Sequence, residues 1–312
     1  MGSWPTIKNT VLDAIGHTPV VWLSRVAGER GARIALKLEF MNPGGSIKDR
    51  IAVALIKDAE DTGRLKPGGT IVEATAGNTG IALAMAAAVF GYRALFVVPS
   101  KMSPDKIRIL QAYGAEVKIV PDLPRDDPDN YQNIAARLGE EISGACYMGQ
   151  FERQANPLAH FVATGPEIWE DTKGNLRAVV AGAGTGGTIS GIGRYLKSKD
   201  PRILVVGADP EGSILSGGAY HPFKIEGMGE DYYPETLDTS VVDRWIAVSD
   251  EAAFAMARRL SRKEGLLVGG STGAIVEAAV MVAAELPPDQ LVVAIAPDTG
   301  RNYLSNIFDT SK

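Results

Sequence analysis

Cysteine and histidine are scarce in this sequence. Its 312 residues include one cysteine, Cys146, and three histidines that stand far apart. An internal disulfide is excluded because it needs two cysteines, and no cysteine or histidine cluster has the spacing of a metal site. A lone cysteine in an apolar stretch is usually a small buried residue, and we expect this of Cys146.

Basic charge and long apolar runs are scarce as well. The formal net charge is −5, which provides no basic field for nucleic acid or for an anionic membrane surface. The longest apolar stretch, 81–90, is too short to span a bilayer, and the N-terminus lacks the pattern of a signal peptide. We therefore expect a cytoplasmic protein with no nucleic-acid or membrane partner.

Glycine is plentiful by contrast, with 35 residues that gather in short loops. β-Branched stretches enter these loops and alanine-rich stretches leave them, which predicts strands alternating with helices. The alternation predicts an α/β fold whose mostly parallel sheets carry helices on both faces, with ligands beyond the carboxyl ends of the strands. The expected strands are 71–73, 94–98, 117–120, 178–180, 203–207 and 291–296, and the expected helices are 51–60, 81–90, 104–113, 131–142, 188–197, 251–264 and 272–285.

The first glycine-rich loop, Asn-Pro-Gly-Gly-Ser-Ile-Lys-Asp-Arg at 42–50, opens a helix. Ser46 is a good N-cap, which puts Lys48 in the first helical turn. The helix dipole disfavours a positive charge there and lowers the pKa of the amine, as imine formation requires. A solvated helix lysine is the simpler interpretation, but the two adjacent glycines allow close approach to a ligand and favour function.

The second loop, Thr-Ala-Gly-Asn-Thr-Gly at 75–80, lies between a strand and a helix. Its backbone N–H groups and short polar side chains form an anion cradle suited to a carboxylate. Three polar residues interleaved with two glycines are more than a plain strand–helix turn needs. We therefore interpret the loop as a binding site.

The third loop, Gly-Ala-Gly-Thr-Gly-Gly-Thr at 182–188, fits a phosphate monoester at a helix N-terminus. It also spells G-x-G-x-x-G, with Asp209 at the end of the next strand, so a dinucleotide-binding function stays open at this point. The fourth loop, Gly-Gly-Ser-Thr-Gly-Ala at 269–274, also opens a helix, and its simplest interpretation is an N-cap by Ser271.

Taken together and in this order, the four loops resemble the fold-type II pyridoxal-phosphate family of cysteine synthases and cystathionine β-synthases. The resemblance extends from Gly-His-Thr-Pro at 16–19 to Pro-Asp at 297–298 and Arg-Asn-Tyr at 301–303. It implies pyridoxal 5'-phosphate as cofactor and a homodimer. It also implies two lobes: a larger cofactor-binding lobe of 1–45 plus 156–312 and a smaller mobile lobe of 46–155.

The resemblance assigns a role to individual residues. Lys48 matches the Schiff-base lysine, and Ser271 matches the hydroxyl that contacts the pyridine nitrogen. Asn78 matches the asparagine beside the phenolic oxygen of the cofactor. The phosphate loop falls on Gly184, Thr185, Gly186, Gly187 and Thr188, and the substrate-binding residues fall on Thr75, Gly77, Asn78, Thr79, Gln150 and Gly227.

The implied reaction is β-replacement on L-serine or an O-activated L-serine by way of an aminoacrylate, with Lys48 as the acid and base. A neutral Ser271 does not hold the pyridine nitrogen protonated, so the ring is a weaker electron sink that favours β-elimination over transamination. Ala76 stands where the family commonly has serine. The leaving group, whether hydroxyl, acetate or phosphate, therefore stays open.

Three segments resemble the cystathionine β-synthase branch, which uses homocysteine, and they lie at 156–160, 209–213 and 226–231. Thr-Gly-Pro-Glu-Ile-Trp at 164–169 resembles cysteine synthase, which uses sulfide. Since no haem-binding or regulatory extension is present, we expect a short, bacterial-type cystathionine β-synthase core. Cysteine synthase is the close alternative function, and an NAD-dependent oxidoreductase is a remote alternative. A third hypothesis is a non-catalytic relative that serves as a partner-binding scaffold.

Overall fold

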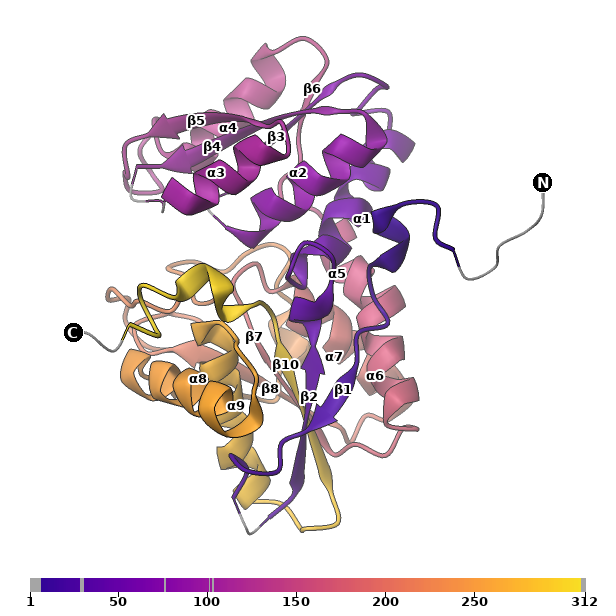
Figure 1. Ribbon diagram of the computed structural model, residues 1–312, viewed down its shortest axis with the longest axis vertical. Coiled ribbons are helices and arrows are strands. Elements are labelled where there is room, and N and C mark those ends of the chain that lie inside the picture. Colours follow the sequence, from indigo (N-terminus) through magenta and orange to yellow (C-terminus); the bar gives the residue numbers. More distant parts are fainter. Residues whose placement is uncertain (1–6, 29–30, 76, 101, 103, 310–312) are drawn as a thin grey trace. The chain divides into compact units, whose positions relative to one another are not determined.

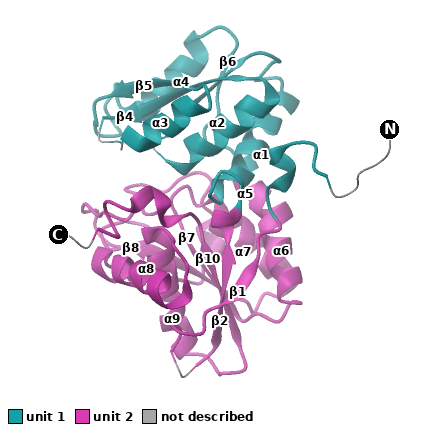
Figure 2. Cartoon of the chain, viewed as in Figure 1, with its two compact units in different colours: residues 1–16, 42–155 teal, residues 17–41, 156–312 magenta. Residues whose placement is uncertain are grey.

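The computed structural model describes residues 7–28, 31–75, 77–100, 102 and 104–309. Contacts divide the chain into two compact units: unit 1 comprises 1–16 and 42–155, and unit 2 comprises 17–41 and 156–312 (Figure 2). Segment 17–41 belongs to unit 2 because its two strands pair within the sheet of that unit. The expected lobes, 1–45 plus 156–312 and 46–155, stay a prediction.

Unit 1 is built on a four-stranded parallel sheet with the order β5-β4-β3-β6 (Figure 1). Its strands are β3 Thr70–Ala74, β4 Arg93–Pro99, β5 Glu116–Val120 and β6 Ala145–Tyr147. Its helices are η1 Val11–Ala14, α1 Lys48–Asp61, α2 Asn78–Phe90, α3 Pro104–Ala112 and α4 Tyr131–Glu141. Val72 and Val97 of the sheet pack against Ile134 of α4, so the apolar stripe of α4 covers one face.

Unit 2 is built on a six-stranded sheet with the order β1-β2-β10-β7-β8-β9, in which only the β1–β2 pairing is antiparallel. Its strands are β1 Val20–Trp22, β2 Arg33–Leu38, β7 Ala178–Gly182, β8 Leu204–Pro210, β9 Arg244–Val248 and β10 Leu291–Ala296. Helix α5 Ala155–Ala159 begins at the boundary with unit 1. The other helical segments of unit 2 are η2 Glu39–Met41, the π-helix η3 His160–Thr164, α6 Gly165–Asp171, α7 Gly187–Lys199, η4 Thr239–Val241, α8 Asp250–Glu264, α9 Gly270–Ala284 and η5 Gly300–Tyr303.

Helices cover both faces of the six-stranded sheet. Figure 1 shows α8 and α9 on one side and α6 and α7 on the other. Val180 and Ala294 share a buried cluster with Ile275 of α9, while the alternate strand residues Val179 and Val293 are equally buried outside that cluster. This two-sided burial explains the uninterrupted apolar strands, which are typical of parallel sheets. The predicted α/β class with mostly parallel sheets is confirmed.

Local sequence signals set the ends of several helices. The Ser249 hydroxyl caps α8 by accepting a hydrogen bond from the Ala252 N–H, and Gly265 ends the helix in the left-handed conformation. Acidic residues occupy the first turn of α8 and basic residues the last, as the helix dipole favours. Gly91 ends α2 in the same left-handed conformation, at φ 79°.

Within the described ranges, no helix is both long enough and apolar enough to cross a membrane.

Candidate active site

Lys48 is the first residue of α1, and the loop before it is tightly held. The Ser46 hydroxyl accepts a hydrogen bond from the Lys48 N–H at 3.2 Å. The carboxylate of Asp49, which is fully buried, accepts one from the Gly44 N–H at 2.5 Å. Gly45 adopts φ 84°, a conformation that favours glycine. The cap differs from the expected one by a residue: the N-cap is Ile47, which makes no side-chain cap, and Ser46 braces the turn just before it.

The predicted carboxylate loop precedes α2 in unit 1. The Thr75 hydroxyl accepts hydrogen bonds from the N–H groups of Gly77 and Gly80, at 3.3 Å and 3.2 Å. Helix α2 begins at Asn78 with Gly77 as N-cap and no side-chain cap hydrogen bond, and the N-terminus of a helix favours an anion. The carboxylate-binding role of this loop stays a prediction. Ala76, the departure from the family pattern, lies outside the described residues.

Thr79 and Gln150 meet within unit 1 although 71 residues separate them. The Thr79 hydroxyl donates a 2.6 Å hydrogen bond to Oε1 of Gln150, and both side chains are buried. This contact fixes the amide of Gln150 with its Nε2 donors turned away from Thr79. Two residues that the resemblance assigned to substrate binding thus act as one structural pair.

Glu73, the fourth residue of β3, is a buried carboxyl group that the sequence analysis missed. It accepts hydrogen bonds from the N–H groups of Ala74, at 2.9 Å, and of Gln150, at 3.2 Å. Burial, which disfavours the charged form, raises the pKa of Glu73 to about 8. A glutamate in the middle of an apolar strand was the available signal, because such a residue needs partners in the core.

The predicted phosphate loop begins α7 in unit 2. Gly186 is the N-cap at φ 79°, and no side chain caps the helix. The Thr185 hydroxyl accepts hydrogen bonds from Nδ2 of Asn156, at 3.0 Å, and from the Gly187 N–H, at 3.4 Å. Since both bonds use the oxygen as acceptor, the Thr185 proton is left to donate. A Cβ built on Gly187 would lie 2.0 Å from Oδ1 of Asn156, so glycine is required there.

The segment Asn-Pro-Leu-Ala-His at 156–160 braces this loop, a role that the sequence analysis did not assign. Asn156 contacts Thr185, and Nε2 of His160 lies 3.2 Å from Oγ1 of Thr188. Both bracing side chains are fully buried. In the sequence this segment indicates only the branch of the family, because nothing there shows that it packs on a loop some thirty residues later.

Gly227 also lies against the predicted phosphate loop. A Cβ built on Gly184 would lie 2.8 Å from the carbonyl oxygen of Gly227. The Gly229 N–H donates a 2.7 Å hydrogen bond to the carbonyl oxygen of Ala183. The backbone of the Gly-Met-Gly turn at 227–229 therefore approaches the loop at a distance that only glycine permits.

Ser271 is the second residue of α9, and its hydroxyl does not cap the helix. The N-cap is Gly269, with no side-chain cap hydrogen bond, so the simple interpretation of Ser271 as an N-cap is wrong. The Ser271 side chain is buried, at 5% exposure. The contact with the pyridine nitrogen that the resemblance assigns to this hydroxyl stays a prediction.

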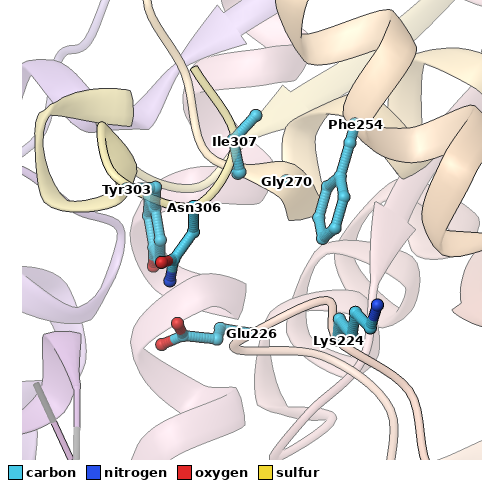
Figure 3. Close-up of a pocket in the computed structure, with 7 residues that line it drawn as sticks. All are labelled: Lys224, Glu226, Phe254, Gly270, Tyr303, Asn306 and Ile307. Atoms are coloured by element: carbon cyan, nitrogen blue, oxygen red, sulfur yellow. The ribbon is translucent and has the colours of Figure 1, made fainter. Parts of the chain in front are cut away.

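A small pocket in unit 2 is lined in part by Gly270, the first residue of α9 (Figure 3). The polar ends of Tyr303, Asn306 and Glu226 gather on one side of it, and Phe254 and Lys224 lie on the other. Its volume of about 20 Å³ has room for about one water molecule. This pocket is therefore too small for a cofactor or an amino acid.

Asp209 does not have the environment of a ribose-binding acid. It is fully buried, and its Oδ2 accepts a 2.8 Å hydrogen bond from the Ser216 N–H. Burial raises the pKa of its carboxyl group above the usual value. The residue holds the 210–216 turn, and this removes the support that Asp209 gave to a dinucleotide site.

The residues of the unit 2 loop fit the phosphate of pyridoxal 5'-phosphate. The start of α7 offers backbone N–H groups, and Thr185 has a proton to donate. Such an arrangement favours a dianionic group through hydrogen bonds and the helix dipole together.

Across the described ranges, no group of three or more His, Cys, Asp and Glu side chains is arranged to hold a metal ion.

Comparison with known proteins agrees with this chemistry. A family model described as "Pyridoxal-phosphate dependent enzyme" matches residues 11–298. Cystathionine beta-synthase of Apis mellifera is 46% identical over 97% of this chain, and so is that of Mus musculus. The chain spans only 62% and 56% of the lengths of these two relatives.

Solved structures resemble this one over nearly the whole chain. O-ureido-L-serine synthase superposes with a TM-score of 0.93 at 39% identity, covering 98% of this chain and 96% of that one. The O-acetylserine dependent cystathionine beta-synthase from Helicobacter pylori gives a TM-score of 0.91 at 40% identity, with coverages of 97% and 99%. Both likenesses extend through unit 1 and unit 2.

Proposed function

The chain belongs to the family of pyridoxal-phosphate dependent enzymes, and from that premise we propose that it replaces the β-substituent of a serine-type amino acid. The proposal rests on one observation: relatives whose names describe cystathionine or O-ureido-L-serine synthesis match nearly the whole of this chain. Each of these products is an alanine skeleton with a new group on its β carbon. Family membership implies pyridoxal 5'-phosphate as the cofactor.

Unit 1 supplies the reacting amine and the substrate-binding donors in this proposal. Lys48 holds the cofactor covalently and moves the proton at the substrate Cα. When bound, the cofactor withdraws electrons from that carbon. The loop residues Thr75, Gly77, Asn78 and Thr79, together with Gln150, bind the substrate carboxylate, and Asn78 also contacts the cofactor. The uncapped start of α2 and the Thr79–Gln150 hydrogen bond support this assignment.

Unit 2 supplies the phosphate-binding and ring-binding groups. Gly184, Thr185, Gly186, Gly187 and Thr188 bind the phosphate, with donors from the start of α7. The Ser271 hydroxyl binds the pyridine nitrogen without protonating it, which favours elimination and replacement over transamination. Gly227 contributes backbone to the substrate-binding region. The approach of its carbonyl group to Gly184 brings it beside the proposed phosphate loop.

We propose homocysteine as the nucleophile, which gives cystathionine. Relatives that bear the cystathionine beta-synthase name at 46% identity support this choice, as do the branch-like segments at 156–160, 209–213 and 226–231. Sulfide, which gives cysteine, is the alternative. The structural likeness to O-ureido-L-serine synthase adds hydroxyurea, the nucleophile that its product requires, as a third candidate.

A product assay distinguishes these functions. Purified holoenzyme is incubated with serine or O-acetylserine, each crossed with homocysteine, sulfide or hydroxyurea, and the amino-acid products are identified by mass spectrometry. We expect cystathionine to form faster than cysteine or O-ureido-L-serine at equal nucleophile concentrations. Faster formation of either other product would transfer the assignment to that activity, and no product with any pair would overturn β-replacement itself.

The remaining assignments are also proposals. We propose a homodimer located in the cytoplasm, with the predicted segments 1–45 plus 156–312 forming the cofactor-binding lobe and 46–155 the mobile lobe. Light scattering coupled to size-exclusion chromatography measures the mass directly. A mass near twice the 33.0 kDa of the chain supports the dimer, and a mass near 33.0 kDa contradicts it.

A further inference from the structure

The imidazole of His160 lies between two threonine hydroxyl groups inside unit 2. Its Nδ1 is 2.9 Å from Oγ1 of Thr164, and its Nε2 is 3.2 Å from Oγ1 of Thr188. The side chain of His160 is fully buried. Thr188 belongs to the phosphate loop, whereas Thr164 lies four residues after His160. The histidine therefore connects the loop to a neighbouring helical segment.

The backbone holds this imidazole at a fixed position. His160 begins the π-helix η3, a rare conformation that is frequent at functional sites. Helix α7 packs directly on this segment, because a Cβ built on Gly191 would lie 2.1 Å from the Pro157 carbonyl oxygen and 2.7 Å from Cβ of His160. This close packing holds the segment that carries His160 against α7.

The protonation of this ring decides which way the Thr188 proton points. A neutral imidazole carries one proton, on either nitrogen. If Nε2 carries it, Nε2 donates to the Thr188 oxygen, and the Thr188 proton is left for another acceptor. If Nδ1 carries it, Thr188 must donate to Nε2 and turns its lone pairs outward. Lone pairs repel an anionic phosphate, so a bound phosphate favours the Nε2–H form.

We propose that His160 is a positioning residue for the cofactor phosphate: its Nε2–H donates to Thr188 and thereby directs the Thr188 hydroxyl proton to a phosphate oxygen. In this arrangement Nδ1 accepts a hydrogen bond from the Thr164 hydroxyl group. The inference rests on the proposed function, since it needs a phosphate ligand at the loop. Asn156 fixes Thr185 in the same way, by donating to its oxygen.

Two substitutions separate the nitrogens of His160. His160→Gln can keep an N–H donor near the Nε2 position, whereas His160→Asn keeps one only near Nδ1. We expect His160→Asn to raise the dissociation constant of pyridoxal phosphate for the apoenzyme about tenfold, which corresponds to about 1.4 kcal/mol. We expect His160→Gln to bind more tightly than His160→Asn. The exposed His221 provides the control, and His221→Gln should bind like the wild type.

The partnership with Thr188 is tested by a double-mutant cycle. Thr188→Val removes the hydroxyl through which His160 acts, so adding His160→Asn should weaken binding by less than about twofold. A purely structural histidine would give two independent losses that multiply. Thermal denaturation of each variant verifies that it is folded at the assay temperature.

The tautomer is measured directly in the unsubstituted protein. The sequence has three histidines, so a sample with ¹⁵N-labelled histidine gives few ring signals, and His160→Asn identifies the relevant one. With pyridoxal phosphate or inorganic phosphate bound, we expect the His160 shifts of a neutral Nε2–H ring. An Nδ1–H ring, a doubly protonated ring or equal binding by the Asn and Gln variants would overturn the positioning role alone. Failure of the wild type to bind pyridoxal phosphate would overturn the proposed function as well.

Discussion

The hydroxyl group of Thr79 donates a 2.6 Å hydrogen bond to Oε1 of Gln150, joining the start of α2 to the segment after β6. The Gln150 backbone N–H also donates to the buried carboxyl group of Glu73. Three residues from separate parts of unit 1 thus form one connected support beneath the proposed carboxylate site. Its geometry is fixed before a substrate arrives, which reduces the cost of ordering these groups on binding.

Loss of the Thr79 hydroxyl should weaken substrate binding. Thr79→Val removes the hydrogen bond that orients Gln150, so we expect KM for the amino-acid substrate to rise about tenfold, with a smaller change in kcat. Thr79→Ser keeps the hydroxyl and should stay near the wild-type value. Steady-state kinetics provides the measurement, with Gln111→Ala on the exposed surface as control. An unchanged KM for Thr79→Val would contradict the carboxylate assignment.

The Glu73 carboxyl group should make the folded state less stable as the pH rises. Its pKa is raised from 4.5 to about 8 in the folded chain, so between these values the folded protein holds a proton that the unfolded chain has released. The contribution is fully present below pH 4.5 and is lost as the pH rises to 8, by up to about 1.4 kcal/mol per pH unit.

Glu73→Gln removes this titration. Urea unfolding at several pH values should therefore show that the difference in free energy of unfolding between wild type and Glu73→Gln shifts in favour of the variant as the pH increases. A difference that stays constant from pH 4.5 to 8 would mean that the carboxyl group is not protonated in the folded chain.

Gly187 should tolerate no side chain. A methyl group there would lie 2.0 Å from Oδ1 of the fully buried Asn156, which would displace Asn156 from Thr185. We expect Gly187→Ala to lower stability by about 2 kcal/mol and to weaken cofactor binding. Gly218→Ala is the matched control, because its nearest neighbouring atom is 3.8 Å from the new Cβ. Equal effects of the two substitutions would contradict the packing argument.

Cys146 should be unreactive in the folded protein. It is only 6% exposed, and burial raises the pKa of its thiol even though the Arg64 guanidinium lies 3.4 Å away. We expect a thiol-specific reagent to modify it slowly in buffer and rapidly in urea, and Cys146→Ala to retain activity. Rapid modification of the folded enzyme, with loss of activity, would indicate a functional thiol.

Much of the fold follows from sequence patterns. The long helices and most of the apolar strands lie where periodicity and glycine loops predict them, since burial on both faces demands continuous apolar runs. Strands β1, β2, β6 and β9 and the antiparallel edge of the second sheet were not predicted. These strands have three to six residues, which carry too little periodicity, and their pairing depends on distant parts of the chain.

The candidate site was predicted in part. The loops themselves are visible in the sequence because glycines and short polar residues cluster there. Two of the residues that support them are not: Asn156 and His160 act on other residues through space, and outside an apolar strand a buried polar residue looks the same in sequence as an exposed one. The cap at Ser271 was wrong for a related reason, because the structure uses the preceding backbone at Gly269 instead.

Reduction with borohydride followed by peptide mapping tests the central claim most directly. Lys48 is proposed to hold the cofactor covalently, so the pyridoxyl group should be found on the peptide that contains Lys48. Lys48→Ala should yield no adduct and no turnover, whereas the exposed Lys57→Ala on the same helix should retain both. An adduct on a different lysine, or no adduct on the wild-type chain, would contradict the account.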